Sequence, residues 1–203
     1  MPLVRGWSGF LCLCFFAPGA QAHGALPGMA GFGSGLIHPL VTTAHLLLLL
    51  SLALWLAQRR PLQLRAALST FVPASATGLA LSTQIAYAAA WQPLLLCMAL
   101  GVAALVLTGR RGPAWLPYPA FALAGLVVGL DSGVDAGAPA LAVGVTLLAT
   151  WLGLSLWLVN GAYYASLLPQ RKWAQIGLRV AASWIAAICL LVLAFAIKRA
   201  GAG

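Results

Sequence analysis

Runs of about 20 apolar residues, separated by short polar turns, recur along almost the whole chain. Because a helix needs about 20 apolar residues to cross the hydrocarbon core of a bilayer, this repetition indicates several transmembrane helices. Of the 203 residues, 63% are hydrophobic and only 6% are charged. Too few charged side chains remain to cover a water-exposed surface. We therefore predict an all-α, polytopic membrane protein.

The first 22 residues have the pattern of a secretory signal peptide. Arg5 precedes the short apolar stretch GFLCLCFFA, and AQA at 20–22 places small residues where such peptides are cleaved. Cleavage after Ala22 would make His23 the first residue of the mature chain; the alternative is an uncleaved first helix. The predicted organisation is a signal peptide at 1–22 and one transmembrane domain at 23–203.

Six transmembrane helices are predicted after the cleaved signal, at about 32–57, 62–82, 85–108, 114–131, 138–163 and 174–197. The short connections between them predict antiparallel neighbours packed as one bundle. The stretches GMAGFGSGL and AGLVVGL contain the pairs Gly31/Gly35 and Gly125/Gly129. This small-xxx-small spacing is typical of helices that approach each other closely.

The basic residues predict how the bundle is oriented. They cluster after the first, third and fifth spans: Arg59, Arg60, Arg65, Arg110, Arg111, Arg171, Lys172 and Arg179. The positive-inside rule places these loops in the cytoplasm and the mature N-terminus in the periplasm of a bacterial inner membrane. Lys198 and Arg199 fall on the predicted outer side, against the rule. They lie at the C-terminal end of the chain, and chain ends obey the rule weakly. Clusters between apolar runs account for the net charge of +9, so no nucleic-acid partner is expected.

The few side chains that can bind a cation fall in the outer half of this predicted topology. Asp131 and Asp135, the only acidic residues of the chain, lie at the outer end of the fourth span and just after it. His38 and His45 lie in the first span, and His23 would be the N-terminal residue. Ionisable groups inside a membrane are functional by default, and imidazole suits nickel, copper, zinc and cobalt. We therefore take all five residues as candidate metal ligands.

The spacing of the two intramembrane histidines limits how they could bind a metal. On a straight helix, His38 and His45 would share one face but lie roughly 10 Å apart along the axis, too far to share one ion. Two successive stations, or one site each with help from another span, are then expected. Alternatively, each histidine donates a hydrogen bond to a neighbouring helix, and Asp135 caps a helix. A free N-terminal His23 would chelate a metal through its α-amine and imidazole, or remain a non-binding end.

The stretch GFGSGLIHPLVTTAHLLLLLSLALWLAQ resembles the first mature helix of the HupE/UreJ family of hydrogenase and urease accessory membrane proteins. The family pattern reads approximately G-F-x-x-G-x-x-H-P-x-x-G-x-D-H-L-L. The matching positions are Gly31, Phe32, Gly35, His38, Pro39, His45, Leu46 and Leu47. The family glycine falls at Thr42 and its aspartate at Ala44, so Asp131 is a candidate to replace that carboxylate from the fourth span. Two later stretches, AFALAGLVVGLDSGVD and IGLRVAASWIAAICLLVLAFAI, are similar to the second half of one branch, but the later His-Gly-x-x-His-Gly-x-Glu motif is missing.

The resemblance implies a permease or metal-supply protein that serves metalloenzymes such as hydrogenase or urease. Nickel or cobalt would be the transported ion, with no other cofactor, and the lipid bilayer would be its surroundings. The alternative is a non-transporting accessory protein that docks another membrane protein or forms a homo-oligomer. An enzyme is not expected, because neither a serine–histidine–aspartate set nor a pair of catalytic carboxylates is evident in the sequence.

Overall fold

The computed structural model describes residues 31–59, 63–84, 91–109, 112–134, 139–169 and 171–200. In this part of the chain all regular structure is helical: α2 (Phe32–Val41), α3 (Thr43–Gln58), α4 (Leu64–Ser82), α5 (Trp91–Thr108), α6 (Pro117–Asp131), α7 (Ala140–Ser166) and α8 (Lys172–Ala200). The predicted all-α class is confirmed for these residues. The predicted signal peptide at 1–22 lies outside them.

The helices are apolar enough to lie in a membrane, although they are unequal in length. Four of them, α4, α5, α7 and α8, are long and apolar enough to cross a bilayer. The bent pair α2 and α3 counts as a fifth span if it is taken as one unit, whereas α6 is a shorter apolar helix of 15 residues. The observed helices thus follow the six predicted segments, and six full crossings remain a prediction.

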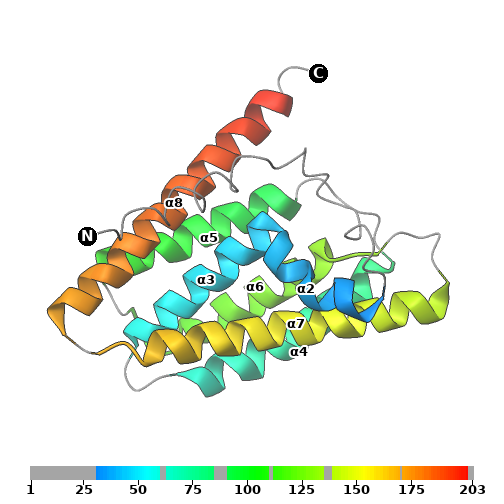
Figure 1. Cartoon of the computed structure of the whole chain (residues 1–203), viewed down its shortest axis with the longest axis horizontal. Helices are drawn as coiled ribbons and strands as arrows, with labels where there is room; N and C mark the ends of the chain where they lie inside the picture. Colours follow the sequence, from blue (N-terminus) through cyan, green and yellow to red (C-terminus); the bar gives the residue numbers. More distant parts are fainter. Residues whose placement is uncertain are drawn as a thin grey trace, which may run out of the picture.

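Helix α3 forms the core of the bundle (Figure 1). Twelve of its 16 residues are buried, because α5 and α7 pack against it and α8, α6 and α2 add smaller contacts. A helix that is apolar on every side is buried, and the sequence of α3 is almost continuously Leu and Ala. The polar side chains of His45, Ser51 and Gln58 on α3 are therefore enclosed by other helices.

Glycines allow two pairs of helices to approach closely. On α6, a side chain at Gly125 or Gly129 would collide with the backbone of α4, and Gly78 of α4 faces Leu126 of α6 in the same way. On α2, a Cβ at Gly35 would lie 2.8 Å from Cβ of Ala149 on α7. The close packing predicted from the sequence for Gly35, Gly125 and Gly129 is confirmed. At Gly31 the space is open, so close packing at that position was a wrong prediction.

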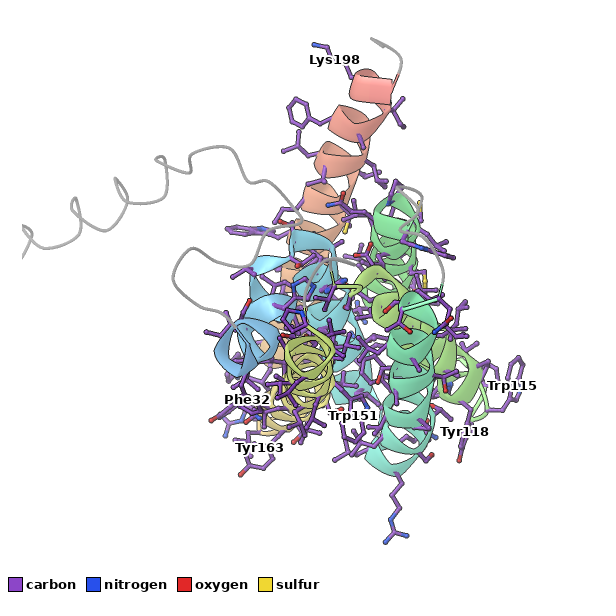
Figure 2. All side chains as sticks on the ribbon, turned by 90° about the vertical axis from the view of Figure 1, so that its right-hand side faces the viewer. Phe32, Trp115, Tyr118, Trp151, Tyr163 and Lys198 are labelled. Carbon is purple, nitrogen blue, oxygen red and sulfur yellow. The ribbon has the colours of Figure 1, made fainter. Side chains whose placement is uncertain are left out.

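The outer surface of the bundle is strongly apolar, and α8 contributes much of it. Figures 1 and 2 show the C-terminal half of α8 standing clear of the other helices, with Lys198 near its tip. Trp115 and Tyr118 project outward beside α6, and Tyr163 lies near the end of α7 (Figure 2). Aromatic side chains with a polar edge are enriched at membrane–water interfaces, so these residues fit interface anchors.

Candidate intramembrane metal-binding site

Helix α6 presents Asp131 to the centre of the bundle because its opposite face is fixed on α4. A Cβ at Gly129 would lie 2.5 Å from the carbonyl oxygen of Ser75 and 2.7 Å from the backbone nitrogen of Leu79. Such contacts leave no room for a side chain, so the two helices meet backbone to backbone. Asp131, the last residue of α6, follows two positions later, and its position is set by this contact.

A break at Thr42 arranges the two histidines. Thr42 has an extended conformation, with φ −84° and ψ 107°, and α2 and α3 meet there at a bend of 70°. Its backbone N–H still donates to the carbonyl of His38, and its own carbonyl accepts from Leu46, so one residue ends α2 and starts α3. Three consecutive β-branched residues, Val41 to Thr43, follow Pro39, and both residue classes disfavour a continuous helix.

The bend corrects the prediction made for a straight helix. Instead of lying roughly 10 Å apart, the imidazole rings of His38 and His45 have centroids 5.2 Å apart and meet edge to face at 71°. The two side chains therefore belong to one site. A metal–nitrogen bond is about 2.1 Å, so two imidazoles on one ion hold their centroids about 5–6 Å apart, which matches the observed spacing.

The central contact of the site joins His45 to Asp131. The Nε2 atom of His45 lies 2.9 Å from Oδ2 of Asp131, and both side chains are almost completely buried. An ionised carboxylate only accepts hydrogen bonds, so beside it the imidazole donates through Nε2–H, and in the neutral tautomer that does so Nδ1 carries the lone pair. The pair joins residues 86 positions apart and brings α3 and α6 together, although these helices share few other contacts.

Each member of the pair keeps one polar atom that is not used. Within the described part of the chain, neither Nδ1 of His45 nor Oδ1 of Asp131 has a hydrogen-bond partner, and both atoms are buried. A buried polar atom without a partner costs roughly 1–3 kcal/mol, so folded proteins retain few of them and those few call for an explanation. Here the unused atoms are an imidazole nitrogen and a carboxylate oxygen, both of which bind divalent metals.

The contact of His45 with Asp131 is similar to one part of many metal sites, the histidine held by a carboxylate. A metal-binding histidine commonly donates its other ring N–H to a carboxylate, which fixes the ring and makes its free nitrogen more basic. Asp131 holds His45 in this way and leaves Nδ1 as the atom available to an ion. Among the described residues, however, no group of three or more His, Cys, Asp or Glu side chains is arranged to hold a metal ion. In this conformation the site offers two imidazoles and one carboxylate without a complete ligand set.

Of the five predicted ligands, the structure brings three to one place and leaves two untested. His45 contacts both His38 and Asp131. His23 and Asp135 lie outside the described residues. Metal binding by all five remains a prediction. Ala44, at the position of the family aspartate, is completely buried next to His45. The carboxylate that contacts His45 belongs to Asp131 of α6.

Two features of the site were missed at the level of sequence. The break at Thr42 was not expected, although the run from Pro39 through Val41, Thr42 and Thr43 carries a usable signal. Trp157 of α7 also supports the site: its indole N–H donates to the carbonyl of Leu36 at 3.3 Å and ties α2 to α7. No sequence pattern marks this second contact.

Four helices long and apolar enough to cross a bilayer, with the pair of His45 and Asp131 buried among them, are typical of a multi-pass membrane protein with a polar site inside its bundle. The model of the HupE / UreJ protein family matches residues 11–194. The chain therefore belongs to the HupE/UreJ family, and its apolar helices fit a membrane protein linked to nickel or cobalt accessory function. No curated protein and no solved structure matches the chain significantly.

Proposed function

We propose that this protein is a secondary transporter or supplier of nickel or cobalt for metalloenzymes, and that it binds the ion as cargo at His38, His45 and Asp131. The observation that carries the proposal is the buried bond between His45 and Asp131. A histidine and a carboxylate are both costly inside a membrane, and such residues usually mark an ion pathway. Family membership supplies the metal class.

The broken helix supports a binding role for this region. In many transporters the substrate lies where a discontinuous helix exposes its backbone ends near the middle of the membrane. Thr42 makes such a break, and His45 lies in the first turn of α3. The Nδ1 atom of His45 and an imidazole nitrogen of His38 would bind the ion, while Asp131 would orient His45 and offset the positive charge. Water or a small rearrangement would supply the remaining ligands.

The direction of entry follows from the charge pattern. With the basic loops in the cytoplasm, the ion would reach this site from the periplasm of a bacterial inner membrane. The sequence contains no nucleotide-binding motif, so transport would be facilitated or driven by an ion gradient. His23 and Asp135 would add ligands near the entrance.

The second candidate is a non-transporting membrane protein that assists the assembly of another one. Two observations favour it: the ligand set is incomplete among the described residues, and long apolar faces of α7 and α8 are exposed. In that case the pair of His45 and Asp131 would only join α3 to α6. Its loss would then weaken the fold without changing the metal content of the cell.

Metal accumulation in cells separates these functions. Cells producing equal amounts of wild type, His45→Gln, Asp131→Asn or Ser132→Ala would be loaded with nickel or cobalt and analysed by mass spectrometry. Ser132 is a matched control, because it is also buried but its hydroxyl donates to its own helix, to Val128. We expect about tenfold less accumulation in the first two variants and none of this loss in the control. Equal metal content in all four would contradict transport, and impaired metalloenzyme maturation alone would favour the assembly role.

A further inference from the structure

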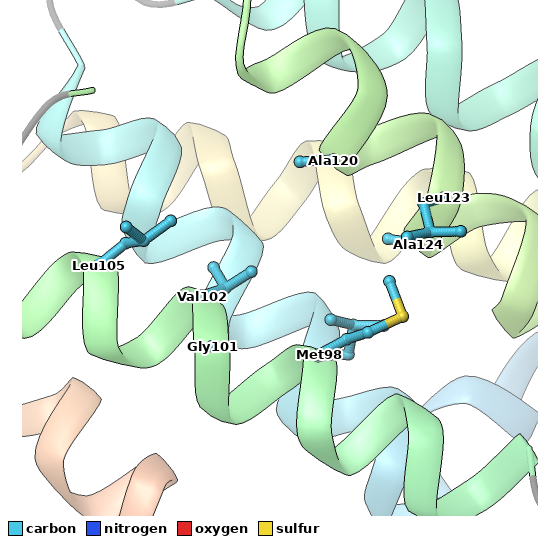
Figure 3. Close-up of a pocket in the computed structure, with 8 residues that line it drawn as sticks. Met98, Gly101, Val102, Leu105, Ala120, Leu123 and Ala124 are labelled. Atoms are coloured by element: carbon cyan, nitrogen blue, oxygen red, sulfur yellow. The ribbon is translucent and has the colours of Figure 1, made fainter. Parts of the chain in front are cut away.

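A hydrophobic groove runs between α5 and α6, and none of the described histidines or acidic residues lines it (Figure 3). Its volume is about 370 Å³, and every residue that lines it is apolar. Met98, Gly101, Val102 and Leu105 come from α5, Ala120, Leu123 and Ala124 come from α6, and Leu48 of α3 completes the lining. The groove follows α5 from Met98 to Leu105, a rise of about 10 Å.

Unequal packing of α6 leaves this groove open. One face of α6 meets α4 at backbone distance, whereas α5 and α3 touch α6 only lightly. The lining residues Gly101, Ala120 and Ala124 are too small to bridge the remaining space. A Cβ built at Gly101 would meet nothing within 4 Å, so a side chain would fit there without a collision. Exposing an apolar groove of this size to water would be costly. An apolar occupant such as a hydrocarbon chain would keep water out of it.

One end of the groove lies close to a positive charge. Leu105 is four residues, about 6 Å, before Gly109, where α5 has ended. The guanidinium group of Arg179 covers Gly109 so closely that a Cβ there would collide with it. Arg179 is otherwise exposed, and Trp115 and Tyr118 project outward beside the start of α6 at the same end (Figure 2). We therefore expect this end of the groove to lie at the level of lipid headgroups.

We propose that the groove holds one acyl chain of an anionic phospholipid, whose phosphate binds Arg179. Apolarity favours a hydrocarbon chain, and the guanidinium at one end favours a negative headgroup over a neutral one. The chain as a whole carries 11 Lys and Arg against two acidic residues, so no carboxylate is described near this end to compete. The lipid would lie between α5 and α6, whereas the bond between His45 and Asp131 joins α3 to α6. This proposal does not depend on metal transport.

Two variants of glycines with open surroundings provide the test. Gly101→Leu fills the groove, and Gly177→Leu adds the same side chain to α8 at a position that also has nothing within 4 Å. Wild type and both variants would be purified from a membrane, exchanged into vesicles of phosphatidylglycerol or phosphatidylcholine, and analysed by native mass spectrometry. Circular dichroism and gel filtration would establish that each variant is folded.

We expect wild type and Gly177→Leu to retain one phosphatidylglycerol under activation that removes phosphatidylcholine. Gly101→Leu should lose this lipid, and Arg179→Gln should retain both lipids equally weakly. Retention of the lipid by folded Gly101→Leu would overturn the proposal, and so would equal loss from Gly177→Leu. A dimer that forms without bound lipid and is broken by Gly101→Leu would assign the groove to a second copy of the chain instead.

Discussion

The two ends of α3 hold their polar side chains in different ways. At the start of the helix, His45 bonds to another ionisable side chain, and each partner keeps a polar atom that no described residue contacts by a hydrogen bond. At the other end, Arg59 lies over the indole ring of Trp55 at 4.5 Å and donates to the backbone carbonyl of Pro113. Trp55 in turn stacks on Phe121 of α6, with the rings 5.9 Å apart and nearly parallel.

Unused buried atoms occur at both ends, because the indole N–H of Trp55 also has no hydrogen-bond partner among the described residues. The two ends differ in the chemistry of those atoms: an N–H group cannot bind a cation, whereas a carboxylate oxygen or an imidazole nitrogen can. The Arg59 end joins α3 to the loop before α6 through a backbone carbonyl, and Gln58 donates to the carbonyl of Val106 on α5 at 3.0 Å. Burial lowers the pKa of Arg59 from its ordinary value, but an arginine stays charged at any physiological pH. The His45 end instead offers donor atoms that an ion could use. We therefore expect changes at the Arg59 end to alter stability, and changes at the His45 end to alter cargo binding.

The largest loss of stability is expected from Trp55→Ala. It removes a side chain that is 1% exposed, together with its stacking on Phe121 and its support of Arg59. Truncating a buried tryptophan costs about 3–5 kcal/mol. Denaturant titration in detergent would measure this change. A loss smaller than that of Ser132→Ala would show that the Arg59 end does not hold the bundle together.

Asp131→Asn should have a smaller effect on stability but a larger one on metal. The amide keeps the shape and can still accept a bond from His45, so the free energy of unfolding should fall by about 1–2 kcal/mol. The lost charge should reduce nickel accumulation about tenfold. If Asp131→Asn reduced stability but left nickel accumulation unchanged, the His45 end would only stabilise the bundle, as the Arg59 end does.

A second carboxylate offers a sharper form of the same comparison. Ala44→Asp places an aspartate where the family pattern has one, next to His45. In an Asp131→Asn background it should restore about a third or more of the lost accumulation, because either carboxylate can support the imidazole. Ala44→Asn in the same background is the control, since it adds similar volume without charge. Equal nickel accumulation in the two double variants would refute the idea that a carboxylate at position 44 can replace the one at position 131.

Arg59→Lys should be milder than either change. Lysine keeps the charge but loses the flat guanidinium that stacks on Trp55 and reaches Pro113, a loss of about 1 kcal/mol. Stability should fall by this amount in the denaturant titration while metal accumulation stays at the wild-type level. Reduced accumulation in a variant of normal abundance would show that the Arg59 end also affects cargo.

The sequence was sufficient for the helices and for much of the site, but not for its geometry. Apolar runs placed all six segments, and the scarcity of acidic residues singled out Asp131 before any contact was known. The glycines at 35, 125 and 129 pack as their spacing predicted. The predicted distance between His38 and His45 was wrong because the prediction assumed a straight helix. A single extended residue, Thr42, bends the chain between them. The glycine spacing predicts that α6 packs closely on another helix, but it does not say which one. The pairing of Asp131 with His45 depends on the choice of α4 as that helix.

The shortness of α6 has a consequence for how any ion would arrive. Fifteen residues rise about 22 Å, whereas the hydrocarbon core of a bilayer is about 30 Å thick. If the exposed Trp115 and Tyr118 mark one membrane surface, the opposite end of α6 would stop short of the other surface. In the proposed transport role, a cation would therefore have to shed part of its hydration shell before it meets the carboxylate of Asp131, and this dehydration would help to set the rate of entry.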